Sequence, residues 1–329
     1  MPQQGSQITH CNLPIRFDTY EGCSHACSYC FVKRKNTLAV RNGENIEALR
    51  KWVSGERPKG FEWCDWDIPI HWGGMSDPFQ PAELERKNSL AALEVFAETQ
   101  YPFVVSTKSS LIAQEPYLSL IKKCNCVVQF SAMCPDYDNF ERGASTFEQR
   151  LQAASVISPF KRVIIRLQPY VPQVFRQVQQ SLKKFADAGV FGVTIEGMKY
   201  LVKKPGTVRC GGDFVYPEDL LLAQFQELRN HAHALGLKFY CAENRLRYLG
   251  DDLCCCGIDG MGWRDNKANL NSFLYDKKNF VFSPAQCVPG TARPFNAIHQ
   301  NSVYQRWAKT GTYKDAMLLE TESNSLVKK

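Results

Sequence analysis

Short apolar runs rich in β-branched and aromatic residues alternate along most of this chain with longer stretches in which apolar residues recur at helical spacing. The short runs have the length of strands, and the longer stretches have the period of helices that cover a sheet. This alternation indicates a parallel sheet with covering helices. We predict strands near residues 13–17, 68–72, 103–106, 127–131, 163–167, 192–195 and 238–241, and helices over residues 81–99, 115–123, 146–158, 173–188 and 217–235.

Two junctions along this pattern have the same design. Gly189 and Gly236 each stand where a predicted helix must end before the next strand begins, as a repeated β/α unit requires. About six or seven such units are predicted, fewer than the eight of a closed (β/α)8 barrel. The alternation is lost after Leu246, so we expect a β/α domain over residues 1–245 and an appended cap or extension over residues 246–329.

A loop near the start of the chain carries the clearest chemistry. Residues 22–31 read Gly-Cys-Ser-His-Ala-Cys-Ser-Tyr-Cys-Phe, with Cys23, Cys27 and Cys30 in a C-x3-C-x2-C spacing. A structural zinc site needs four protein ligands, and a 4Fe-4S cluster used for electron transfer is normally held by four thiolates. Three thiolates leave one iron open to a ligand that is not protein, so this spacing predicts a cluster that activates a bound molecule.

Other cysteines leave alternatives open. Cys11 could complete a four-cysteine zinc or cluster site with the loop, and His25 is a further possible ligand. A zinc site would indicate a zinc-containing nucleic-acid-binding protein, although such proteins usually repeat C-x2-C pairs. A second group, Cys254 to Cys256 with Cys287, could hold an auxiliary cluster or another metal. Side chains of consecutive residues diverge, however, and buried cysteines that bind nothing are common.

Composition limits the class of protein. The chain has 329 residues, of which 44% are hydrophobic, enough to bury the core of an enzyme-sized domain. Residues 1–10 are polar and unlike a signal peptide, and no apolar run has the length of a membrane span. With 14 cysteines, we expect a soluble protein of the reducing cytoplasm. The net charge of +7 permits a nucleic-acid substrate without requiring one.

The cysteine loop, with aromatic Tyr29 before Cys30, resembles the C-x3-C-x-aromatic-C motif of the radical S-adenosylmethionine (SAM) superfamily. The resemblance implies a 4Fe-4S cluster whose open iron binds SAM, and an external electron donor of the flavodoxin or ferredoxin type. It also implies the fold: an α/β partial (β/α)6-type TIM barrel with a C-terminal extension. SAM would be cleaved to methionine and a 5'-deoxyadenosyl radical that abstracts hydrogen from a substrate.

A narrower resemblance follows from the turn after the second strand. Gly73-Gly74-Met75 stands where many superfamily members have Gly-Gly-Glu, and it continues as Ser-Asp-Pro-Phe-Gln-Pro, which looks like the spore photoproduct lyase group. Later segments in matching order are residues 106–109, 128–131, 141–144, 150–151 and 166–172. This likeness spans residues 17–196. It implies a lyase-like enzyme acting on a nucleic acid base or nucleotide; a maturase of a peptide or small metabolite is the alternative.

The resemblance also implies roles for single residues. The backbone at Tyr29 would contact adenine, Gly73 and Gly74 would allow close approach of SAM, and Ser76 and Asp77 would supply polar groups beside it. Lys108 and Ser131, at strand ends, would bind the SAM carboxylate or ribose, although Lys108 could be an ordinary exposed lysine. Arg166 and Gln168 share one strand face and are further cofactor-binding candidates. The catalytic candidates are Cys241, as a hydrogen donor, and Glu196, which could instead be the ion-pair partner of Arg166.

Overall fold

The computed structural model describes residues 2–4, 10–30, 39–56, 68–267 and 269–276, and its largest element is one sheet of eight strands. The strands lie in the order β1-β2-β5-β6-β7-β8-β9-β13. β1 is antiparallel to β2, and all other neighbours are parallel. Their bounds are β1 Gln3–Gln4, β2 Ile15–Phe17, β5 Ile70–Trp72, β6 Phe103–Thr107, β7 Cys126–Ser131, β8 Arg162–Tyr170, β9 Gly192–Gly197 and β13 Lys238–Cys241.

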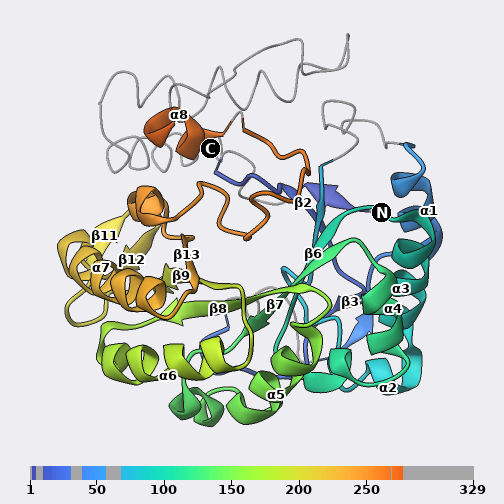
Figure 1. The fold of residues 1–329 in the computed structure, drawn as a ribbon, viewed down its shortest axis with the longest axis horizontal. Coiled ribbons are helices and arrows are strands. Elements are labelled where there is room, and N and C mark those ends of the chain that lie inside the picture. Colours follow the sequence, from blue (N-terminus) through green and yellow to red (C-terminus); the bar gives the residue numbers. More distant parts are fainter. Residues whose placement is uncertain (1, 5–9, 31–38, 57–67, 268, 277–329) are drawn as a thin grey trace.

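Helices cover the outer face of this sheet, which curves into an arc (Figure 1). Each strand from β5 to β9 is followed by a helix before the next strand of the sheet. Every residue of β6 and β9 is buried, as expected for strands covered on both faces. The predicted α/β partial barrel is therefore confirmed. The helices are α1 Ile46–Val53, α2 Glu83–Arg86, α3 Asn88–Thr99, α4 Tyr117–Lys123, α5 Phe147–Ile157, α6 Phe175–Asp187, α7 Glu218–Ala234 and α8 Leu270–Tyr275.

All seven predicted strands are present, with ends that differ by at most a few residues. Both glycine junctions are confirmed, since Gly189 and Gly236 have left-handed φ values of 71° and 76° directly after α6 and α7. The helix predicted over residues 81–99 is interrupted at Lys87, whose φ is 54°. The break is stabilised by the buried Glu83, whose carboxylate accepts hydrogen bonds from the backbone of Ser89 and Leu90 in the first turn of α3.

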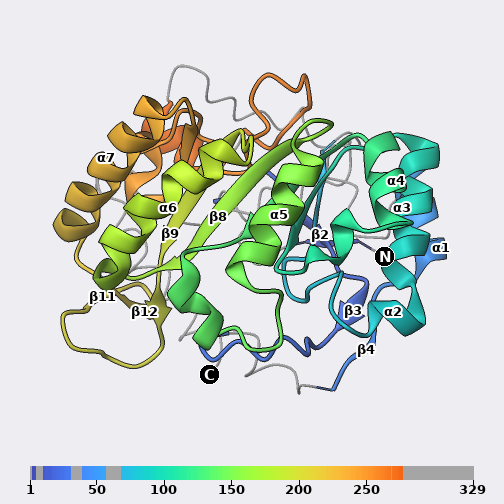
Figure 2. The same ribbon diagram turned by 60° about the horizontal axis from the view of Figure 1, so that its bottom comes forward.

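Several short elements were not predicted, because runs of two to six residues carry no clear period. β3 (Tyr20–Glu21) pairs with β4 (Arg41–Asn42). A small sheet has the order β10-β12-β11 and follows β9 in the chain; Figure 2 shows it projecting below α7. Its strands are β10 Lys199–Tyr200, β11 Val208–Cys210 and β12 Asp213–Val215, and 3-10 helices cover residues 110–113, 135–139, 172–174 and 244–249.

The described part of the C-terminal segment links the two edges of the large sheet. Asn271 donates to the backbone oxygen of His10, just before β2, and Tyr275 donates to that of Asn244, just after β13. Between them, the Gln129 amide donates to the oxygen of Cys256 and Arg162 donates to that of Gly257, so residues 254–259 lie against β7 and β8. Residues 277–329, with most of the predicted cap, lie outside the described ranges.

The described helices were also considered as membrane spans. None of them combines the length and the apolar character that crossing a bilayer would need.

Candidate active site

The cysteine loop lies where β2 ends, beside the turn that follows β5. That turn needs a glycine at its first position, because a Cβ on Gly73 would stand 2.4 Å from the backbone oxygen of Ser106, and its φ is 87°. Gly74 has no atom within 4 Å of a built Cβ, so its surface is open. Asp18 fixes the next residues by accepting from the backbone N–H groups of Met75 and Ser76, at 3.0 and 3.2 Å.

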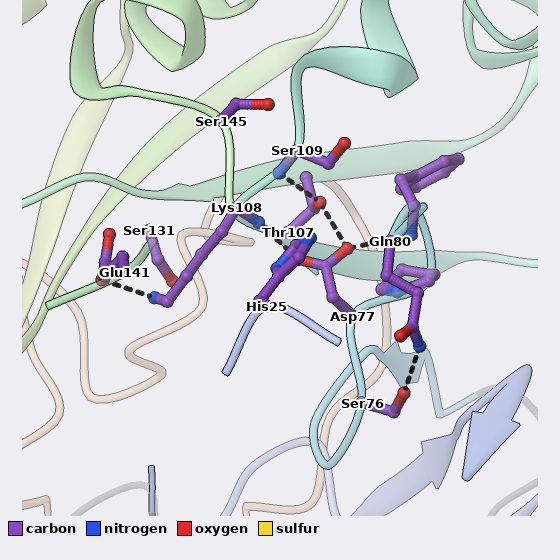
Figure 3. Close-up of polar contacts among 12 residues, drawn as sticks. His25, Ser76, Asp77, Gln80, Thr107, Lys108, Ser109, Ser131, Glu141 and Ser145 are labelled. Carbon is purple, nitrogen blue, oxygen red and sulfur yellow. Dashed lines mark hydrogen bonds and ion pairs between the residues drawn. The ribbon is translucent and has the colours of Figure 1, made fainter. Parts of the chain in front are cut away.

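Asp77 joins three loops at the carboxyl ends of the strands (Figure 3). One carboxylate oxygen accepts from the Thr107 hydroxyl at 2.8 Å, and the other accepts from the backbone N–H of Lys108 at 2.6 Å. The same oxygen lies 3.4 Å from Nδ1 of His25 in the cysteine loop. Asp77 is therefore occupied by internal contacts that hold the cysteine loop against the end of β6.

Gln80 anchors the start of the cysteine loop by hydrogen bonds to its backbone. Its side chain is fully buried; Oε1 accepts from the backbone N–H of Ser24 at 2.9 Å, and Nε2 donates to the oxygen of Gly22 at 3.1 Å. Ser76 adds a 2.7 Å bond to the same Gly22 oxygen and accepts from Gln80. Both flanks of Cys23 are thus held by side chains of the β5 turn, a role for Gln80 that the sequence reasoning missed.

The loop between β7 and α5 holds the other end of the cysteine loop. The backbone N–H of Ser28 donates to the oxygen of Phe140 at 2.8 Å, and that of Gly143 donates to the oxygen of His25 at 3.1 Å. The three cysteines therefore lie on a segment that is anchored on two sides. Cys27 is buried, while Cys23 and Cys30 are partly exposed.

The thiols of Cys23 and Cys27 favour the protonated form in this environment. Burial, followed by the carboxylate of Asp77, raises the pKa of Cys23 to about 12. Burial also raises the pKa of Cys27 to about 11, although Lys108 opposes that shift. Thiolates are the metal-binding form, so these cysteines need the positive charge of a bound metal centre to ionise at neutral pH.

Among the residues that the structure describes, the two candidate fourth ligands, Cys11 and His25, contact other groups. Burial and then the neighbouring Cys255 raise the pKa of the Cys11 thiol to about 12. His25 faces Asp77. Within the described ranges, no group of three or more His, Cys, Asp or Glu side chains, the three loop cysteines included, is arranged to hold a single metal ion.

Lys108 belongs to a buried charge network at the mouth of the barrel. Its ammonium lies 3.4 Å from Oε1 of Glu141, and the Tyr29 hydroxyl donates to the same carboxylate. The fully buried Arg150 contacts Glu141 and Asp138 and donates to the backbone oxygen of Ser131 at 2.6 Å. Burial alone would raise the pKa of Glu141, but Lys108 and Arg150 outweigh it and hold that pKa below its ordinary value.

The candidates on β8 and β9 lie on the inner face of the barrel. The Arg166 guanidinium donates to the Gln168 side chain, which confirms that the two share a face. Gln168 in turn donates to Glu196, and Lys199 completes an ion pair with that carboxylate. Glu196 is therefore the ion-pair partner of Lys199, and within the described ranges no ion pair joins it to Arg166.

The remaining cysteines lie deeper. Cys241 is fully buried, its Sγ is 3.7 Å from the oxygen of Glu243, and burial raises its pKa. The Cys256 thiol lies close enough to the thiols of Cys254 and Cys255 to contact both, contrary to the expectation that consecutive side chains diverge. Cys287 lies outside the described ranges.

Comparisons with known proteins agree with this geometry. No family model matches the chain. Uncharacterized protein Rv2578c of Mycobacterium tuberculosis is 25% identical over 234 residues, which cover 66% of this chain and 68% of that protein.

Two solved structures share the fold. A variant of spore photoproduct lyase with bound AdoMet and dinucleoside spore photoproduct has a TM-score of 0.53 at 17% identity, over 69% of this chain and 76% of that one. SuiB of Streptococcus suis, bound to its precursor peptide SuiA, has a TM-score of 0.52 at 12% identity, over 69% of this chain and 48% of SuiB. The three-cysteine loop thus stands on a partial-barrel fold that this chain shares with spore photoproduct lyase and SuiB.

Proposed function

We propose that this protein is a radical SAM enzyme in which Cys23, Cys27 and Cys30 hold a 4Fe-4S cluster. The observation that carries the proposal is the three-thiol loop, anchored by Gln80 and by the loop before α5 at the carboxyl ends of the strands. Chemistry in β/α barrels gathers at that end. When bound and reduced, the cluster would supply the electron that cleaves SAM to methionine and a 5'-deoxyadenosyl radical.

The donor set supports a cluster with one open iron. Three thiols share the loop, Cys11 is directed elsewhere, and His25 is engaged by Asp77. A closed zinc site with four protein ligands, as in the nucleic-acid-binding alternative, would need one of those two residues to leave its present contacts. The open iron would then be available to SAM.

The surroundings of the loop suggest how the chain would hold SAM. The open surface of Gly74 permits close approach of a ligand to the backbone. Lys108, held beside Tyr29 by Glu141, would pair with the SAM carboxylate, and Ser131 would meet the carboxylate or ribose from the end of β7. Ser76 and Asp77 would contribute mainly by holding the loops in place, since both make internal hydrogen bonds.

For the substrate, we propose a nucleic acid base or nucleotide from which the radical abstracts hydrogen. The net charge of +7 and the dinucleoside bound by spore photoproduct lyase support this choice. Glu196, on the inner barrel face, would position the reacting group, and Cys241 is a candidate hydrogen donor that would have to become accessible. The peptide bound to SuiB supports a second candidate, a peptide substrate. An external flavodoxin or ferredoxin and a cytoplasmic location complete the proposal.

Substrate mass distinguishes these candidates. The anaerobically reconstituted protein would be incubated with dithionite, SAM and either oligonucleotides or a peptide library, followed by mass spectrometry. A mass change confined to the oligonucleotides supports the proposal, and one confined to peptides supports the alternative. Iron analysis adds a second criterion, because one cluster gives about four irons per chain and a maturase with an auxiliary cluster gives about eight.

A further inference from the structure

Arg166 stands on the inner face of β8 with a hydrogen-bonding shell that contains no acid. Its Nη1 donates to the Ser106 hydroxyl at 3.0 Å and to the Gln129 side-chain oxygen at 3.4 Å, and lies 3.4 Å from Nε2 of His71. Its Nη2 donates to the side-chain oxygen of Gln168. Residues of four neighbouring strands thus orient the guanidinium, and all its partners are neutral amide, hydroxyl or imidazole groups.

Among the described residues, the titratable groups around Arg166 provide no counter-ion for it. Burial, and then Arg166 itself, lower the pKa of His71 to about 3, so its imidazole is neutral. Cys11 also feels the charge of Arg166, but burial raises the pKa of its thiol to about 12. Glu196, one strand away, is taken by Lys199 and Gln168.

Three other inward or buried cations differ in this respect, whereas the buried Arg247 likewise has no carboxylate among its described partners. Arg150 has Glu141 and Asp138, Lys199 has Glu196, and Arg245 has Glu243 at 2.8 Å. Within the described ranges, no carboxylate lies within ion-pair distance of Arg166. Half-buried charges are costly unless they are paired, so the neutral shell holds the guanidinium in a fixed direction and leaves its charge available.

A polar group beside Arg166 has no hydrogen-bond partner among the described residues. Thr194 is paired with Arg166 in the register of β8 and β9, and its residue is 4% exposed. The hydroxyl of Thr194 is buried without a hydrogen-bond partner among the described residues. A buried hydroxyl without a partner calls for a ligand or water, and it lies next to a cation without a counter-ion.

We propose that Arg166, with Thr194 beside it, binds an anionic oxygen group of a reactant, either a carboxylate or a phosphate. Oriented guanidinium groups suit both, because their N–H groups match two oxygens at once. The identity of the source rests on the proposed function: the carboxylate would be that of SAM, and the phosphate would belong to a nucleic-acid substrate. Arg166 is assigned here as a binding residue, and Lys108 already has Glu141 as its counter-ion.

The test compares charged and neutral forms of each probe by anaerobic isothermal titration calorimetry on the full-length reconstituted protein. The probes are SAM, decarboxylated SAM, a short oligothymidylate and its uncharged methylphosphonate analogue. The test variant is Arg166→Gln. A second variant, Arg166→Lys, keeps the positive charge but lacks the paired N–H groups of the guanidinium. Arg176→Gln is the control, since this arginine is exposed on α6 and pairs with Glu227.

Arg166→Gln should weaken one charged probe by about 10- to 100-fold, because a charge-assisted hydrogen bond is lost, and leave its neutral counterpart unchanged. Selective loss for SAM assigns the carboxylate, and selective loss for oligothymidylate assigns the phosphate. Unchanged binding of both charged probes, or equal loss for charged and neutral probes, would overturn the proposal. Absence of SAM cleavage by the wild type would instead refute the proposed function, and the oligothymidylate comparison would still decide the role of Arg166.

Discussion

Gln80 offers the most demanding test of how the cysteine loop is held. The change Gln80→Leu keeps the volume of the side chain and removes its bonds to Gly22, Ser24 and Ser76. Gly22 retains the bond from Ser76, whereas the backbone N–H of Ser24 loses the partner that Gln80 supplies. We expect the change to weaken the docking of the cysteine loop by about 2–5 kcal/mol, because the Ser24 N–H is left unsatisfied and the other hydrogen bonds of Gln80 are lost. Each 1.4 kcal/mol changes an equilibrium constant tenfold, so a loss of about 3 kcal/mol would raise the undocked fraction of the loop roughly 100-fold.

Two measurements would report the effect of Gln80→Leu. Iron and sulfide content after anaerobic reconstitution reports on the loop, and urea unfolding reports on the whole fold. Gln80→Leu should retain much less iron than wild type, and Gln80→Glu, which keeps an acceptor for Ser24, should fall between them. Gln152→Leu, at an exposed position of α5, is the matched control and should behave as wild type. Full iron retention with unchanged stability in Gln80→Leu would refute the idea that Gln80 fastens the loop.

Four further changes test other parts of the account. Gly73→Ala should lower the free energy of unfolding by at least about 1–3 kcal/mol, because residue 73 has a left-handed backbone and its new Cβ would clash with the backbone oxygen of Ser106. Gly74→Ala should be close to neutral, because the space around Gly74 is open. Equal urea midpoints for the two variants would contradict this. Cys27→Ala should abolish both cluster and SAM cleavage while Cys255→Ala preserves cleavage, and equal loss in both would show that the C-terminal cysteines serve the same centre. Arg150→Met should destabilise the protein by about 3–5 kcal/mol, because Glu141 and Asp138 lose a buried partner; thermal unfolding at wild-type temperature would rule this out. Arg245→Met should likewise destabilise the protein, because Glu243 loses its buried partner. Burial alone would raise the pKa of Glu243, but Arg245 and Lys199 hold it below its ordinary value of 4.5, so the stabilisation is present above pH 4.5 and is lost as the pH falls through the lowered pKa. A loss of stability in urea unfolding that does not shrink in acid would argue against the pair.

The sequence predicted what depends on local periodicity and spacing. Apolar runs located all seven parallel strands, and Gly189 and Gly236 marked two helix ends, because these signals lie within a few neighbouring residues. The break at Lys87 was not predicted, since it depends on the Glu83 carboxylate turning back to cap α3. Two-residue strands such as β10 give no period to detect.

The candidate site was likewise predictable where it depends on local spacing and not where it depends on long-range contacts. The three-cysteine spacing located the loop, but its anchor, Gln80, is 56 positions away from Ser24 in the chain, so the contact exists only once the barrel forms. Arg166 and Gln168 were placed on one face by strand alternation. The partner of Glu196 depended on the unpredicted β10, which brings Lys199 beside it.

Formation of 5'-deoxyadenosine tests the central claim most directly. The wild-type protein, reconstituted anaerobically with iron and sulfide, would be incubated with dithionite and SAM, and the products separated and identified by mass spectrometry. The account predicts 5'-deoxyadenosine and methionine from the wild type and neither from Cys27→Ala. A protein that contains zinc in place of iron, or one that carries a full cluster and leaves SAM intact, would contradict it.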